Sequence, residues 1–152
     1  MPPDALRALV DDPSGLANEE TVLRVVQAGR FTGRDIHSNA FEDQRLEVAQ
    51  SYGLLDHCAS VAVKSVWQAK SGDVQDILGL FGPGAGLAEV SVAALRNLKN
   101  ANDIAIPQGL MLDPREGAPW HAVVFRLAGG KRPKGENSAI RKVATWFWHP
   151  GD

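Results

Sequence analysis

The chain has 152 residues, of which 44% are hydrophobic and 22% are charged, and its formal net charge is −2. This length is typical of one domain, and this composition argues against a disordered or fibrous protein. The slightly acidic balance gives the chain as a whole no attraction to nucleic acid or to acidic membranes. The single cysteine excludes an intramolecular disulfide and a zinc site built from several thiolates.

The first ten residues, MPPDALRALV, lack the basic start and the apolar core of a secretory signal. No run of about 18 apolar residues occurs anywhere in the chain, so no membrane span is predicted. We therefore expect a cytoplasmic protein, or one that is exported without a classical signal.

Apolar residues recur at helical spacing through most of the first hundred residues. The clearest stripe contains Ala59, Ala62, Val63, Val66 and Trp67. Together with the glycine and proline breakers, such stripes predict six helices, at residues 2–10, 19–29, 40–52, 58–70, 74–81 and 87–100.

The apolar pattern changes after residue 100. Four segments have strand character, at residues 103–107, 110–112, 121–127 and 140–149. Because side chains alternate along a strand, Trp146 and Trp148 are expected to share one face of the last segment. We therefore predict an α+β fold with one domain over residues 1–152, in which a mainly helical part (1–100) packs on a small antiparallel sheet (101–152).

Cys58 and His121 form the constellation that best suggests chemistry. Cys58 is predicted in the first turn of a helix, and His121 is predicted at the start of a strand. A helix N-terminus and a neighbouring imidazole both favour the reactive thiolate. A third polar group must orient the imidazole, and the downstream candidates are Glu136, Asn137 and His149. Inert core packing is the alternative interpretation of Cys58, because lone cysteines are among the most buried residues.

The order of these segments resembles the NlpC-type and CHAP-type branch of papain-like peptidases and amidases. The segments that carry the resemblance are HCAS at residues 57–60, NDIAI at 102–106 and WHAVV at 120–124. The resemblance would cover about residues 54–149. It implies that Cys58 is the nucleophile and His121 is the base.

A second candidate surface combines basic and aromatic side chains near the C-terminus. Its members are Lys131, Arg132, Lys134, Trp146 and Trp148. Basic groups for phosphates and aromatic faces for stacking are how proteins grip single-stranded nucleic acid. The alternative is a solvated loop beside a strand that buries one of its faces.

Trp120 joins the candidate binding residues because it precedes His121. The four histidines lack the spacing of a metal site, so neither a metal nor another cofactor is predicted.

The leading functional hypothesis is a small cysteine hydrolase that acts on a peptide or amide bond, with Glu136 or Asn137 orienting His121. The first alternative is a non-enzymatic protein-interaction module, for example an adaptor or regulator in a bacterial conflict system. The second is a nucleic-acid-binding module, which the acidic balance disfavours. The expected partner is a peptide or a protein, and no membrane partner or oligomeric state is predicted.

Overall fold

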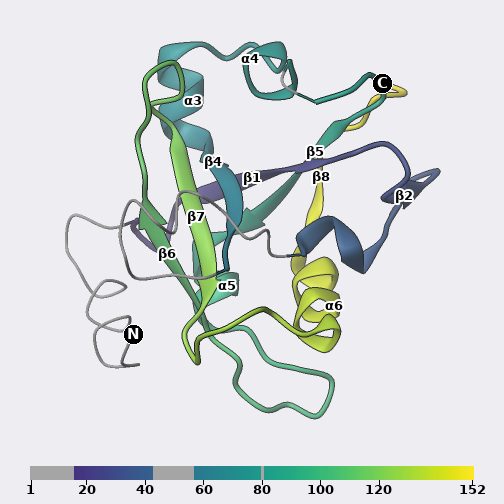
Figure 1. Ribbon diagram of the computed structural model, residues 1–152, viewed down its shortest axis with the longest axis vertical. Coiled ribbons are helices and arrows are strands. Elements are labelled where there is room, and N and C mark those ends of the chain that lie inside the picture. Colours follow the sequence, from purple (N-terminus) through teal and green to yellow (C-terminus); the bar gives the residue numbers. More distant parts are fainter. Residues whose placement is uncertain (1–15, 43–56, 80) are drawn as a thin grey trace.

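A six-stranded antiparallel sheet forms the centre of the protein (Figure 1), with strands in the order β6-β7-β4-β1-β5-β8. The structure is a computed structural model that describes residues 16–42, 57–79 and 81–152. The strands of this sheet are β1 (Thr21–Val26), β4 (Ala59–Val63), β5 (Gly86–Ser91), β6 (Gln108–Leu112), β7 (His121–Arg126) and β8 (Thr145–Trp148). A separate two-stranded hairpin consists of β2 (Phe31–Thr32) and β3 (Asp35–Ile36).

Helical segments cover both faces of the sheet. They are the 3₁₀ turn η1 (Ser38–Phe41) and the helices α3 (Lys64–Lys70), α4 (Gln75–Leu78), α5 (Val92–Arg96) and α6 (Lys134–Val143). One face of the sheet packs against α5, α6 and η1, and we call it the α6 face. The other face packs against α3 and α4, and we call it the α3 face.

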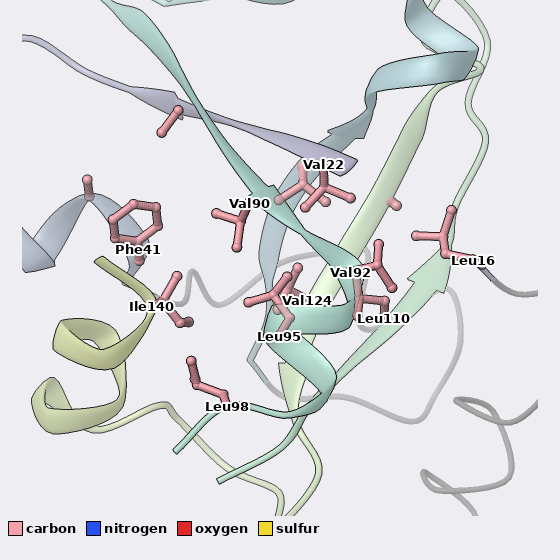
Figure 2. Packing of buried hydrophobic residues seen from close by; sticks show 14 of the residues in the cluster. Leu16, Val22, Phe41, Val90, Val92, Leu95, Leu98, Leu110, Val124 and Ile140 are labelled. Atoms are coloured by element: carbon pink, nitrogen blue, oxygen red, sulfur yellow. The ribbon is translucent and has the colours of Figure 1, made fainter. Parts of the chain in front are cut away.

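The core on the α6 face joins sheet and helix side chains (Figure 2). Its sheet residues include Val22, Val90 and Val124, which meet Leu95 from α5 and Ile140 from α6. On the α3 face, strand residues such as Leu23, Ala62 and Leu87 pack against Trp67, Ile77 and Leu78 from the two helices. The central strands therefore bury side chains on both faces.

The predicted fold, with six helices on a small C-terminal sheet, is wrong. The described residues contain four α-helices, and the large sheet begins as early as Thr21. The segment 19–29 contains β1, whereas 58–70 and 87–100 each divide into a strand followed by a helix. A strand that is buried on both faces reads as a continuous apolar run, which periodicity alone does not distinguish from a helix.

The other predicted elements have mixed outcomes. The strand predicted at 121–127 is confirmed as β7, and 110–112 lies within β6. The segment 103–107 contributes only an isolated bridge between Lys99 and Ala105. The helix at 74–81 shortens to α4, and the strand at 140–149 shortens to β8 because α6 occupies its first residues. The predicted helix at 2–10 and most of the one at 40–52 lie outside the described residues.

A bulge changes the faces of the C-terminal tryptophans. Leu87 is paired with Trp148 and its neighbour Ala88 with Trp146, so the register shifts between them. Trp146 packs against the α6-face core, whereas Trp148 packs against the α3-face core. The predicted shared face of Trp146 and Trp148 is therefore wrong, because an extra residue in a bulge interrupts the alternation.

Arg24 ties the 3₁₀ turn to the sheet. Its Nε donates to the carbonyl oxygen of Ala40 at 3.1 Å, and its guanidinium donates to the carbonyl oxygen of Ser60 at 2.8 Å.

Over the described ranges, no helix combines the length and apolar character needed to cross a membrane.

Gly86 offers a test of the packing between β5 and β8. A Cβ atom at this position would lie 2.7 Å from the Trp148 carbonyl oxygen and 2.9 Å from Cζ3 of Trp146. We expect Gly86→Ala to lower the free energy of unfolding by about 1–3 kcal/mol, as overpacking does elsewhere. The control is Gly82→Ala, where the new Cβ meets nothing within 4 Å. Urea denaturation checks this, and equal midpoints for the two variants would contradict the close approach.

Candidate active site

A pocket of about 340 Å³ lies on the α3 face of the sheet. Its lining residues come mainly from β1, β4 and α4 and from the loop at 115–120. Most of its lining is apolar, including Leu23, Ala62 and Ile77, and its polar lining includes Ser60 and His121. An apolar hollow with a few polar groups is the usual form of a small-ligand or active site.

The β6–β7 hairpin brings Asp113 and His121 together. Asp113 directly follows β6, His121 opens β7, and the amide of Asp113 donates to the carbonyl oxygen of His121 at 2.9 Å. The Nδ1 atom of His121 lies 2.9 Å from Oδ2 of Asp113 and 3.1 Å from its carbonyl oxygen. Nδ1–H therefore donates to Asp113, and Nε2 is left as the acceptor of the neutral ring.

Arg115 completes this polar group. Its Nε donates to Oδ2 of Asp113 at 3.0 Å, and Arg115 also lines the pocket. The side chains of Asp113 and His121 are only 11% and 14% exposed, whereas that of Arg115 is 44% exposed. The carboxylate thus receives two hydrogen bonds and is screened from solvent, which holds the imidazole in one orientation.

Burial is the main influence on the charge of His121. It lowers the pKa of the imidazole below the ordinary value of 6.5, and the positive charge of Arg115 lowers that pKa further. The charge and hydrogen bonds of Asp113 act in the opposite direction but do not reverse the shift. The His121 ring is therefore neutral at pH 7, which is the state that a general base requires.

Ser60 is the hydroxyl that the sheet places beside His121. β4 pairs with β7 so that Ala62 lies opposite His121 and Ser60 lies opposite Val123. Ser60 and His121 are then diagonal neighbours on one face, a relation that separates Cα atoms by about 7–8 Å and that long side chains can bridge. Ser60 is partly exposed, lines the pocket, and makes no side-chain hydrogen bond to a described residue.

The structure does not bring Cys58 to His121. Ala62, and not Cys58, is the register partner of His121, and Cys58 lies four residues before Ala62, about 13 Å along an extended chain. Cys58 precedes a strand and not a helix, so it also lacks the predicted helix N-terminus. Cys58 is fully buried and is not among the residues that line the pocket.

The predicted orienting residues lie on the wrong side of the sheet. Glu136 and Asn137 belong to α6, whereas His121 lies on the α3 face. The carboxylate of Glu136 accepts from Gln108 at 3.0 Å and from Arg126 at 2.9 Å. Asp113, and not Glu136 or Asn137, is the residue that lies within hydrogen-bond distance of the His121 ring.

The basic and aromatic candidates do not form one surface. Arg132 is only 2% exposed and donates to Gln108 and to the carbonyl oxygen of Phe41, while Lys131 and Lys134 are exposed. The ring of Trp146 packs edge-on against that of Phe31, with 5.2 Å between the ring centroids, and its Nε1 donates to the Arg34 carbonyl oxygen.

The other two tryptophans among the predicted binding residues belong to the α3-face core. Trp148 packs partly buried against that core, and Trp120 is buried in it and lines the pocket. The predicted tryptophan platform for nucleic acid is therefore divided between the two faces of the sheet.

The site predicted from the sequence includes His121 but not Asp113, Arg115 or Ser60, which the structure places beside it or in the same pocket. The signal for Asp113 was its place before a turn, where Asp113-Pro114 and Glu116-Gly117 separate two strand segments. A hairpin brings the residues at its two ends together, so Asp113 could have been paired with His121 from the sequence. The position of Ser60 near His121 results from the pairing of β4 with β7, two strands far apart in the sequence, and no local pattern predicts that pairing.

Within residues 16–42, 57–79 and 81–152, no group of three or more His, Cys, Asp and Glu side chains is placed to hold a metal ion. Comparison with family models, with curated proteins and with solved structures finds no match to this chain.

The lowered pKa of His121 predicts a pH-dependent stability. Below pH 6.5 the unfolded chain takes up the imidazole proton before the folded chain does, so the free energy of unfolding falls. This contribution is fully present above pH 6.5 and is lost as the pH falls through the folded-state pKa. His121→Asn keeps an N–H donor for Asp113 and has no titrating ring. Urea denaturation from pH 8 to pH 5 should show a smaller decrease for this variant, and parallel curves would contradict the lowered pKa.

Two substitutions should move the pKa of His121 in opposite directions. Arg115→Gln removes a positive charge and should raise the pKa, whereas Asp113→Asn removes a negative charge and should lower it. The measurement is an NMR titration of the imidazole carbon resonances. Arg34→Gln, at an arginine whose side chain is 62% exposed and pairs with Asp152, is the charge-matched control and should leave the His121 titration unchanged. Shifts of the same sign in the Arg115 and Asp113 variants would overturn the assignment of causes.

Proposed function

We propose that this chain is a small hydrolase in which His121, oriented by Asp113, is the general base for the Ser60 hydroxyl. The observation that carries the proposal is the bond between Nδ1 of His121 and Asp113, which leaves Nε2 available to the pocket. A nucleophile, a base and an orienting carboxylate in this relation are the components of a serine hydrolase site.

The chemistry runs in two steps. The Ser60 oxygen attacks the carbonyl carbon of an ester or amide while Nε2 of His121 takes the hydroxyl proton. The tetrahedral intermediate then collapses, the bond to the leaving group breaks, and Nε2 returns the proton to the departing oxygen or nitrogen. A water molecule, deprotonated by the same Nε2, releases the acid from the acyl-serine and restores the Ser60 hydroxyl.

Some of the remaining lining groups support an acyl group as substrate, beside the charged side chains of Arg24, Asp76 and Glu116. Leu23, Ala62 and Ile77 supply an apolar wall for its hydrocarbon part. Arg115 places a positive charge at the same pocket, where it favours the negative charge that develops on the carbonyl oxygen. Asp113 keeps its hydrogen bond to the imidazolium and so stabilises the charged form of His121 during the reaction.

Nucleic-acid binding is not proposed because Arg132 is buried and Trp146 and Trp148 pack inward on opposite faces. Phosphate contacts need accessible cations, and base stacking needs exposed aromatic faces. The same packing removes the exposed tryptophan face on which the hypothesis of an interaction module depended.

The test is hydrolysis of p-nitrophenyl butyrate by purified protein. His121→Asn and Ser60→Ala should each lower kcat/KM by about 10²-fold or more, the size of a general-base contribution. Ser65→Ala, at an exposed serine on α3 that donates to Glu20, is the matched control and should retain activity. Cys58→Ala should also retain activity.

A mass increase on Ser60 after reaction with a fluorophosphonate would identify it as the nucleophile. Loss of activity in Cys58→Ala but not in Ser60→Ala would contradict Ser60 and return the role to the thiol. No hydrolysis above the background rate by the unmodified protein would overturn the proposal.

A further inference from the structure

Trp120 brings an indole N–H to the pocket on the α3 face. It directly precedes His121, it lines the pocket, and it is only 8% exposed because its ring belongs to the α3-face core. Ser60 and His121 line the same pocket. An N–H donor, the proposed nucleophile and the proposed base therefore border one hollow.

Within the residues that the structure describes, Nε1 of Trp120 has no hydrogen-bond partner. The indoles of Trp67 and Trp146 show the usual arrangement, since they donate to the carbonyl oxygens of Asp73 at 3.1 Å and Arg34 at 2.8 Å. Nε1 of Trp120 is also not one of the described polar atoms that are both fully enclosed and unpaired. This N–H therefore retains accessible surface, and at the pocket wall it is open to an acceptor.

Backbone pairing fixes the place of this donor. The carbonyl oxygen of Trp120 accepts from the amide of Val63 at 2.8 Å, and the amide of His121 donates to the carbonyl oxygen of Ala118 at 3.1 Å. The ring itself is held by the α3-face core. A donor that is already in position needs no reorganisation when a ligand arrives, which is the condition for strong electrostatic stabilisation.

The N–H of Trp120 differs in kind from the charge of Arg115, which lines the same pocket. The Arg115 side chain is 44% exposed and its Nε is bonded to Asp113, so water screens its charge. The indole is buried among apolar residues such as Ala62 and Ile77, where a hydrogen bond is stronger than it is in water. A neutral donor in such surroundings suits a neutral acceptor, and a carbonyl oxygen is one.

We infer that the N–H of Trp120 donates a hydrogen bond to the carbonyl oxygen of a ligand in this pocket, and that Trp120 is a further catalytic residue. The catalytic part of this inference rests on the proposed function. When the Ser60 oxygen attacks, the carbonyl oxygen gains negative charge and its hydrogen bond to the indole becomes stronger. No proton is transferred, because the indole only donates. The ligand class that follows is a carbonyl compound with an apolar chain.

The first test does not depend on hydrolysis. Methyl butyl ketone is titrated into the unmodified full chain, and the indole N–H signals of its four tryptophans are followed by NMR. We expect a saturable shift of the Trp120 signal to higher frequency, because its N–H gains an acceptor. The signal of Trp148, which does not line the pocket, should stay in place.

The matched control is the alkene in which a CH₂ group replaces the carbonyl oxygen of this ketone. It has the same shape but accepts no hydrogen bond, so it should not produce the shift to higher frequency. Equal shifts with the two compounds, or no shift with the ketone, would overturn the inference.

The second test is hydrolysis of p-nitrophenyl butyrate by Trp120→Phe, which keeps an aromatic ring and removes the N–H. We expect kcat to fall about 10²-fold with little change in KM, the loss that follows removal of one donor to the developing oxyanion. Trp148→Phe is the control and should retain activity, because Nε1 of Trp148 is also unpaired within the described residues but lies away from the pocket. A higher KM with an unchanged kcat would overturn the catalytic role.

The two tests separate this inference from the proposed function. If the ketone shifts the Trp120 signal but the chain hydrolyses no ester, the hydrolase is wrong and carbonyl recognition by Trp120 stands. If the ester is hydrolysed and Trp120→Phe keeps its kcat, the hydrolase stands and the catalytic role of Trp120 is wrong. If Trp120→Phe does not fold, the titration of the unmodified chain decides.

Discussion

The antiparallel pairing of β4 with β7 determines which side chains meet on each face of the sheet. The pairs Ala62–His121 and Ser60–Val123 direct Ser60 and His121 to the α3 face, and the pair Val61–Ala122 fills the α6-face core. A slip of one residue would turn each of these side chains to the other face. Burial on both faces penalises such a slip, because apolar side chains on one side and the polar group on the other would exchange surroundings. The hydrophobic core and the candidate site therefore depend on one register.

The sheet also separates two polar groups that differ in their role. On the α6 face, a chain of hydrogen bonds joins α6 to the sheet through the buried Arg132, Gln108 and Glu136 and the half-buried Arg126. These groups satisfy one another, which is the condition for burying charge without a large penalty. On the α3 face, Asp113 and Arg115 hold His121 at the wall of a pocket. The first group attaches α6 to the sheet. The second group binds only Nδ1 of His121 and leaves Nε2 available to a ligand.

What the sequence could predict follows from how local each feature is. The strand at His121 was identifiable because β-branched residues cluster there between turn signals. The segments of β1 and β5 predict helices because their apolar residues fit a helical stripe as well as they fit a strand that is buried on both faces. These residues are Val22, Val25 and Val26 in β1, and Leu87 and Val90 in β5. The contact between His121 and Asp113 could be predicted, because the two residues flank one hairpin. The proximity of His121 to Ser60 could not. It requires the register of strands whose residues are about sixty positions apart in sequence.

The bulge between β5 and β8 has a consequence for association between copies of the chain. β8 is an edge strand of four residues, its pairing is interrupted after Trp146, and Pro150 lies close to Gly86 at the far end of the pair. Short, kinked edges that end near a proline present few aligned amide and carbonyl groups to an incoming strand. The β8 edge therefore disfavours pairing with a strand of a neighbouring molecule, which is the first step of edge-to-edge aggregation.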